Sequence, residues 1–226
     1  MYPFLRFIIL LCFLTPVVSW AQTGAVQKPT MQFRTIAGDI APEELYYEYN
    51  KQDVAVTIPR DTRSLDFPHT GSDPIVFYKL ILGPDGKKVR QAVASVDLST
   101  VGVHPLFMFF KDQNSSGNIR VLVMKEDEAS FPAADCRFAN FSKIPLQIGF
   151  GSEKFILQPN NVLDRRPTTL TVYLTATALM QNTNISLLTH NMLCDPRERY
   201  LIIANPSLST DTPIEIKRLT DMVMHR

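Results

Sequence analysis

The chain has 226 residues, of which 45% are hydrophobic and 10% aromatic, and its formal net charge at pH 7 is +1. This composition excludes an intrinsically disordered chain, because it supplies ample apolar surface to bury. The near-zero charge argues against a nucleic-acid partner, since proteins that bind nucleic acids carry a basic excess. A chain of this length forms one large β domain or two small ones.

The first 21 residues have the order of a secretory signal peptide. Arg6 supplies an early positive charge, an apolar run follows over 7–14, and a small-x-small pattern closes the segment at 19–21. The apolar run is too short for a membrane span, and no later stretch reaches the roughly 18 apolar residues that a span needs. We therefore expect export to the periplasm or the cell exterior. Because Arg6 is the one charged residue of this segment, the exported chain has no formal net charge.

Beyond a short flexible lead-in, apolar and polar residues alternate with a period of two, which predicts β-strands. The alternation and the intervening turn signals predict strands over 45–49, 54–58, 75–82, 89–96, 106–110, 119–123, 146–150 and 155–157. The first two form a hairpin, and 89–96 pairs back on 75–82 across a Gly-Pro-Asp-Gly turn. The charged segments 125–128 and 164–166 are interpreted as solvated breaks or turns.

Three tyrosines on the first hairpin raise the question of a glycan-binding platform. Tyr47 and Tyr49 share the face of Leu45, so alternation assigns them to the core. Only Tyr46 points away, and a single exposed tyrosine is a weak platform for stacking on sugars. The core interpretation is therefore preferred.

The order of strand, three-residue turn, strand and proline that begins at Leu45 recurs 101 residues later at Leu146. This favours a weak internal duplication, although any two β domains share alternation and turns. Further echoes pair Phe33-Arg34 with Cys136-Arg137, and the run 106–110 with 200–204.

The predicted organisation follows from these signals. It comprises a signal peptide (1–21), a flexible lead-in (22–31), a first module (32–127), a linker (128–133) and a second module (134–221). We expect an all-β protein with two tandem antiparallel β-sandwich modules of immunoglobulin-like type.

No catalytic or metal-binding constellation emerges, so we predict no enzyme, no cofactor and no metal. The four histidines, at 69, 104, 190 and 225, form no metal-ligand pair and are expected to be exposed or in loops. Gly71-Ser72 and Gly151-Ser152 lack the nucleophile-elbow pattern and are interpreted as turns. Cys194 with His190 makes a poor dyad. Residues 112–119 begin like a calcium loop, but Val123 stands where its bidentate acid belongs, which favours a hairpin loop.

Cys136 and Cys194 are the cysteines that remain after the signal segment, which contains Cys12. An even count in an oxidising compartment permits a disulfide between them. Two buried free thiols are the alternative, because unpaired cysteine is itself a common core residue.

The segment from Arg120-Val121-Leu122-Val123 through Phe131-Pro132 to Arg137-Phe138-Ala139-Asn140-Phe141-Ser142 resembles a group of uncharacterised exported proteins of verrucomicrobial and related bacteria. The turn Gly83-Pro84-Asp85-Gly86-Lys87 is also similar. The resemblance implies β-sandwich modules in an exported protein and no known activity. Cys136 departs from that pattern, so the resemblance implies no disulfide.

Together these features predict an exported, non-catalytic structural or interaction protein of the periplasm or cell envelope, with an envelope protein or a glycan as partner. One alternative is a two-domain periplasmic assembly chaperone, which would need a basic cleft between its modules beside an exposed edge strand. The other is a carbohydrate-binding protein.

Overall fold

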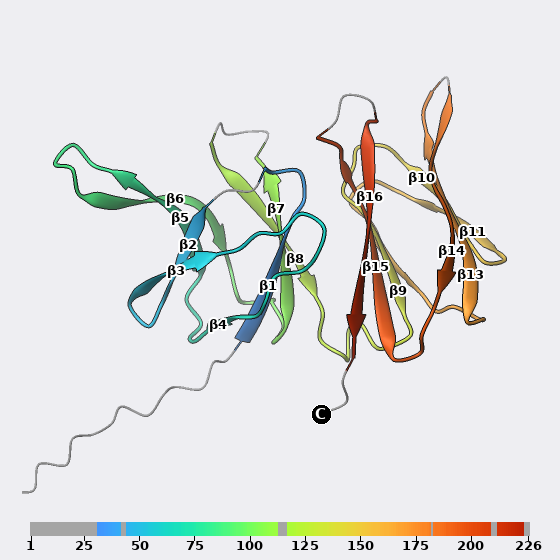
Figure 1. Cartoon of the computed structure of the whole chain (residues 1–226), viewed down its shortest axis with the longest axis horizontal. Coiled ribbons are helices and arrows are strands. Elements are labelled where there is room, and N and C mark those ends of the chain that lie inside the picture. The colour runs from blue at the N-terminus through green and yellow to red at the C-terminus, as the bar shows by residue number, and fades with distance from the viewer. Residues whose placement is uncertain (1–30, 42–43, 113–116, 182, 209–211, 224–226) are drawn as a thin grey trace, which may run out of the picture.

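The computed structural model describes residues 31–41, 44–112, 117–181, 183–208 and 212–223. These residues form sixteen β-strands in four sheets of four and contain no helix (Figure 1). The expected all-β fold with two tandem β-sandwich modules is confirmed. Within the same ranges, no helix has the length and apolar character to cross a membrane.

The first module has an outer and an inner sheet. The outer sheet has the order β3-β2-β5-β6, and the inner sheet has the order β4-β1-β7-β8. The strands are β1 (Met31–Ala37), β2 (Leu45–Tyr49), β3 (Gln52–Val56), β4 (Phe67–His69), β5 (Ile75–Leu82), β6 (Lys88–Val96), β7 (Pro105–Lys111) and β8 (Ile119–Lys125).

The second module repeats this plan. Its outer sheet has the order β11-β10-β13-β14 and its inner sheet the order β12-β9-β15-β16. The strands are β9 (Cys136–Asn140), β10 (Leu146–Phe150), β11 (Glu153–Leu157), β12 (Val162–Arg165), β13 (Thr171–Leu179), β14 (Asn184–Leu193), β15 (Glu198–Pro206) and β16 (Ile214–Met222).

The two modules share one topology, so the repeat expected from the sequence is present in the structure. Each departs from the expected antiparallel arrangement at one place, because β1 pairs with β7 and β9 pairs with β15 in parallel. In these ladders Arg34 faces Leu106 and Arg137 faces Leu201. The run 106–110 therefore corresponds to 201–205, one residue beyond the echo read from the sequence. The shift matters because one residue exchanges the two faces of a strand.

Alternation places the side chains of β2 as predicted. Leu45 and Tyr47 are fully buried between the sheets, Tyr49 is half-buried, and Tyr46 lies on the outer face. The β2–β3 turn is tight because Asn50 and Lys51 both adopt positive φ, at 51° and 62°, as a two-residue hairpin loop requires.

Aromatic rings fill the core of the first module around Phe33. The Phe33 ring centroid lies 4.8 Å from that of Phe107, 5.2 Å from Tyr47 and 5.4 Å from Phe67. Edge-to-face and offset pairs at these distances add to the free energy gained by burial alone. The core of the second module has a smaller ring cluster, in which Phe138 contacts Phe150 and Phe155, and it also contains Cys136, Cys194 and many aliphatic side chains.

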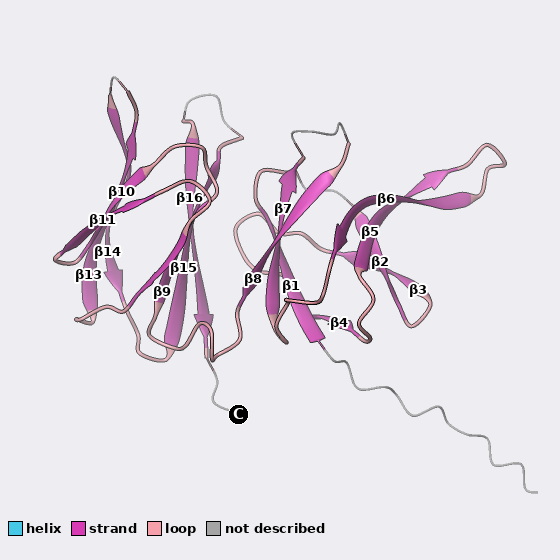
Figure 2. Ribbon diagram, turned by 180° about the vertical axis from the view of Figure 1, so that it is seen from behind, coloured by secondary structure: helices cyan, strands magenta, loops and turns pink. Residues whose placement is uncertain are grey.

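The inner sheets of the two modules pack against each other, so the molecule is a stack of four sheets (Figures 1 and 2). Side chains such as Leu106 and Met108 of β7 meet Leu201 and Ile203 of β15 in one buried apolar cluster. This explains the nearly unbroken apolar sequence of β7 and β15, since both faces of each strand are covered.

An ion-pair network lies at one side of this junction. Arg34 contacts Glu126 at 2.8 Å and Asp221 at 2.9 Å, Arg63 contacts Glu126 at 2.7 Å, and Arg199 contacts Asp221 at 2.7 Å. The side chain of Glu126 is fully buried. The prediction of a solvated break at 125–128 was therefore wrong for Glu126, because arginines distant in sequence surround its carboxylate.

The charged segment 164–166 is also corrected by the structure. Asp164 and Arg165 belong to β12 and pair with β9. The Asp164 carboxylate accepts hydrogen bonds of 2.7 and 2.8 Å from the buried Arg137 guanidinium. The Arg137 guanidinium also lies 4.3 Å from the centroid of the Phe131 ring, and that of Arg199 lies 5.3 Å from it, so the connector residue Phe131 contacts two cations.

Replacing Asp221 with Asn removes the carboxylate that Arg34 and Arg199 share. We expect a loss of about 2–4 kcal/mol at pH 7, because the buried Arg199 guanidinium then lacks its carboxylate, and Arg34 and Arg63 are left to share Glu126. Although burial opposes it, hydrogen bonding to both arginines holds the pKa of Asp221 well below its usual range. The contribution of Asp221 to the free energy of unfolding is therefore fully present above the pKa of an unfolded carboxyl group. It is lost as the pH falls from there through the pKa of Asp221 in the folded state.

Urea unfolding at pH 7 and at pH 3 measures the difference in free energy of unfolding between wild type and D221N. This difference should be smaller at pH 3 than at pH 7. The control is Glu153→Gln, which removes an exposed partner of Arg165 and should change stability by no more than about 0.5 kcal/mol. An equal loss in both variants would contradict a special role for the junction.

Candidate functional site

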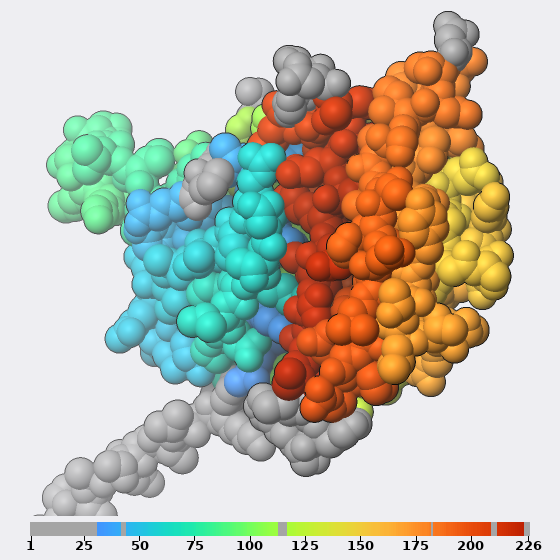
Figure 3. All heavy atoms as spheres, turned by 45° about the vertical axis from the view of Figure 1, so that its right-hand side comes forward, coloured from blue at the N-terminus to red at the C-terminus, as the bar shows by residue number. Residues whose placement is uncertain are grey.

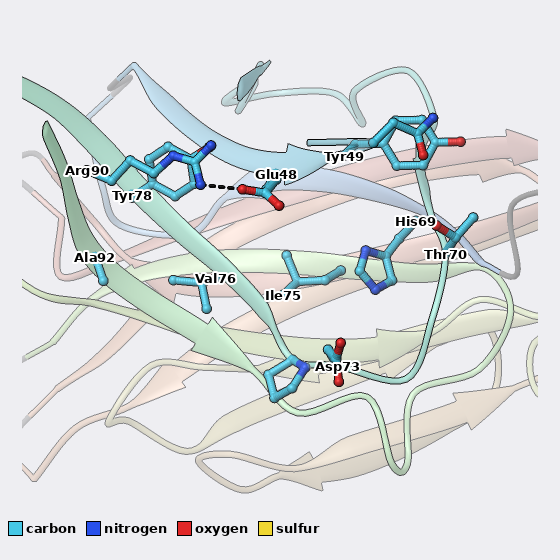
Figure 4. A pocket seen from close by; sticks show the side chains of 12 residues that line it. Glu48, Tyr49, His69, Thr70, Asp73, Ile75, Val76, Tyr78, Arg90 and Ala92 are labelled. Atoms are coloured by element: carbon cyan, nitrogen blue, oxygen red, sulfur yellow. Dashed lines mark hydrogen bonds and ion pairs between the residues drawn. The ribbon is translucent and has the colours of Figure 1, made fainter. Parts of the chain in front are cut away.

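The outer sheet of the first module carries the best-formed surface site among the described residues. Side chains of β2, β5 and β6, with the segment that follows β4, line a pocket of about 430 Å³ (Figure 4). Its polar lining includes Glu48, Tyr49, His69, Asp73 and Arg90. The pocket therefore combines both signs of charge with aromatic groups at the sheet surface.

Three planar groups stack across this sheet. Tyr46 on β2 is paired directly with Tyr78 on β5, and their rings lie 6.3 Å apart with an interplanar angle of 18°. The Arg90 guanidinium of β6 lies 4.9 Å from the Tyr78 ring centroid. Tyr78 is consequently only 3% exposed although it faces outward. The stack is held by strand register, with a bulge between Phe77 and Tyr78.

Two carboxylates hold the polar ends of the stack. Arg90 is ion-paired with Glu48 and, at 2.5 Å, with Asp53, whose carboxylate also accepts a 2.5 Å hydrogen bond from the Tyr78 hydroxyl. That hydrogen bond, with further help from Arg90, holds the pKa of Asp53 below its usual range. Burial and the hydrogen bond to Asp53 raise the pKa of Tyr78. The cluster is therefore pre-organised, with one guanidinium held between two carboxylates.

His69 differs from its prediction, because it is buried rather than exposed. It ends β4, where it is paired with Met31 of β1, so it belongs to the inner sheet and not to a loop. Burial lowers the pKa of His69, opposed by a backbone hydrogen bond at Asp73. β4 has only three residues, which is too short for a recognisable alternation, so the sequence does not predict a strand at His69.

The β5–β6 hairpin extends beyond the body of the module (Figures 1 and 3). Near its tip Leu82 is 74% exposed, and Ile81 and Val89 are about 40% exposed. Ile81 is paired with Val89 across the hairpin, and Leu82 is paired with Lys88. Since Tyr78, Leu80 and Leu82 alternate along one strand, the tyrosine stack continues into this apolar tip on one face.

The other sequence candidates do not assemble into a site. His104 and His190 are exposed as expected, whereas Cys194 is buried, so His190 and Cys194 form no dyad. Gly71 and Gly151 lie in turns with positive φ. In the part of the chain that the structure describes, no group of three potential metal ligands occurs. His225 and the centre of the calcium-loop motif, 113–116, lie outside the described residues.

Sequence reasoning identified Tyr46 as outward-facing but missed its partners. Alternation also places Glu48 on the outer face beside Tyr46, so the sequence could have predicted that these two residues share a surface. Tyr78, Asp53 and Arg90 join the cluster only through the register between β2, β3, β5 and β6, and β5 contains a bulge that periodicity does not locate.

Comparison with known proteins finds no match, either among protein-family models or among curated proteins. The outer sheet is therefore the candidate site on chemical grounds. It combines stacked tyrosines and an arginine, residue types that are enriched at protein interfaces, with exposed aliphatic side chains beside them.

Replacing Tyr78 with Phe should raise the pKa of Asp53 toward its ordinary value, because the largest influence lowering it is the Tyr78 hydroxyl. The stability difference between wild type and Y78F should be present at neutral pH and disappear as the pH falls through the folded pKa of Asp53. Carboxyl carbon NMR titration measures the pKa. Tyr46→Phe is the control, because the Tyr46 hydroxyl bonds to Glu44. An unchanged Asp53 pKa in Y78F would refute this account of the cluster.

Proposed function

We propose that this chain is an exported, non-catalytic interaction protein of the periplasm or cell envelope, which binds a partner protein through the outer sheet of its first module. The observation that carries the proposal is the projecting β5–β6 hairpin, on which Leu80 and the exposed Leu82 continue the face of the Tyr46–Tyr78–Arg90 stack. Ile81 and Val89 are exposed on the other face of the same hairpin. Contiguous exposed apolar side chains on a projecting element are typical of interaction surfaces. The signal-like segment 1–21 supports export.

A protein partner is favoured over a glycan by the way the tyrosines are used. Sugar stacking needs an aromatic face open to solvent. Tyr46 and Arg90 cover the two sides of Tyr78, which is almost fully buried. By contrast, Leu82 offers its side chain freely at the hairpin tip. The carbohydrate-binding alternative therefore has less support from this surface.

The assembly-chaperone alternative has one supporting observation. β6 is an edge strand of the outer sheet, so a partner strand could extend the sheet there. The carboxylate-capturing cations that such a chaperone needs between its modules are not offered by Arg34, Arg63 and Arg199. These three arginines are already paired with Glu126 and Asp221. Strand addition at β6 is therefore the second candidate.

Photo-crosslinking tests the proposed surface. A photoreactive amino acid at position 82 of the full chain, expressed in the native host, should give a discrete crosslinked protein band. The same group at Leu65, which is 88% exposed in a loop of the same module, is the matched control and should give none. Equal labelling from both positions, or no adduct from position 82, would contradict the proposal.

The L82D variant should weaken the interaction, because it places a charge where the partner would bury an apolar side chain. We expect about a tenfold loss of crosslinking yield from a photoreactive group at position 80, which shares the face of Leu82. An unchanged far-UV spectrum and melting temperature exclude misfolding as the cause. Full yield in L82D would show that the hairpin tip is not a contact.

Export is tested separately by deleting residues 2–21. The deleted form should remain in the cytoplasmic fraction, whereas the full chain should appear in the osmotic-shock fraction, since the signal segment directs translocation. Quantitative immunoblotting of both fractions, with a cytoplasmic enzyme as marker, gives the readout. Identical distributions would overturn the proposed export.

A further inference from the structure

Two thiols, one from each sheet of the second module, meet in its core. Cys136 opens β9 in the inner sheet, and Cys194 directly follows β14 in the outer sheet. Both are buried, at 0% and 3% exposure, both belong to the apolar cluster between the two sheets, and each thiol is close enough to influence the pKa of the other. They therefore face one another across the sandwich.

Backbone pairing holds both cysteines in place. Cys136 is paired with Arg165 on one side and with Tyr200 on the other. The amide of Cys194 donates a 2.7 Å hydrogen bond to the carbonyl of Leu170. A contact between two residues anchored in this way belongs to the folded architecture of the sheets rather than to a loose segment.

The equivalent place in the first module is occupied by an aromatic residue. Because Arg34 and Arg137 hold the same position in the two parallel ladders, Cys136 corresponds to Phe33. Phe33 contacts four rings, those of Tyr47, Phe67, Phe77 and Phe107. The first module thus links its sheets through a large aromatic cluster, and the second has two small thiols at that level.

We propose that Cys136 and Cys194 join as a disulfide that ties the two sheets of the second module together. In this reaction one thiolate attacks a disulfide oxidant, glutathione disulfide or the disulfide of a thiol oxidase, and releases one oxidant thiol. The second cysteine then displaces the other oxidant sulfur from the mixed disulfide. Two protons and two electrons pass to the oxidant, which leaves as two thiols.

The location of the bond dictates when it forms. Burial raises the pKa of both cysteines, so the reactive thiolate is scarce once the module has folded. The bond must therefore form while the second module is still open. After folding it lies in the core, out of reach of soluble reductants, which makes it a structural rather than a regulatory bond.

Oxidative refolding of residues 22–226 tests the proposal, since Cys136 and Cys194 are the two cysteines of that segment. After refolding from urea in a glutathione redox buffer, we expect no alkylatable thiol and an intact mass lower by about 2 Da than that of the reduced chain. Dithiothreitol should reduce the folded protein at least about a hundredfold more slowly than the urea-unfolded protein, because the bond is buried. Two alkylatable thiols after oxidative refolding would overturn the proposal.

The stabilising effect gives a second readout. The oxidised protein should melt about 5–10 °C above its reduced form, because the bond closes a long loop of the unfolded chain. Cys194→Ala is the matched control, which should keep one alkylatable thiol and show no oxidation-dependent melting shift. Identical melting of the oxidised and reduced wild type would contradict a bond that ties the sheets.

The inference rests on the proposed export only for the source of its oxidant in the cell, and the refolding test supplies that oxidant. Failure of the disulfide would leave the crosslinking result at Leu82 unaffected, because the hairpin belongs to the first module. Conversely, failure of the interaction proposal would not change the thiol count. The two proposals are therefore distinguishable.

Discussion

The double-sided burial of the inner sheets is the constraint on which the rest of this structure depends. β7 and β15 each pack into their own sandwich on one face and against the other module on the opposite face. Apolar burial on both sides fixes the separation of the modules, and the network around Glu126 and Asp221 fixes their register, because buried charges tolerate little displacement from their partners. The two sandwiches therefore act as one four-layered body.

Because the inner sheets are buried, the surfaces that can bind a partner are those of the outer sheets and the loops. The arginines at the junction are ion-paired with Glu126 and Asp221, and the Phe131 ring lies against both Arg137 and Arg199. The outer sheets remain open to solvent, and the β5–β6 hairpin extends furthest from the body of the first module (Figure 1). A rigid stack that presents one projecting hairpin with exposed apolar side chains suits recognition, since little conformational entropy is lost when a pre-organised surface binds.

The two modules share a topology but differ in the residues that connect their two sheets at the level of Phe33 and Cys136. The first relies on the rings around Phe33, and the second places Cys136 and Cys194 at the corresponding level. Aromatic packing needs no particular redox condition, whereas the thiol pair gains most where an oxidant is available.

The sequence by itself determined the period of the strands, the hairpin turns and the repeat, because alternation and turn chemistry are local properties. It also determined that Tyr47 is buried and Tyr46 is not. Only the tertiary structure decided that Glu126 is buried, that Tyr78 is covered by Arg90, and that the apolar runs of β7 and β15 face a second module. These facts depend on contacts between segments far apart in the chain, which local periodicity does not encode.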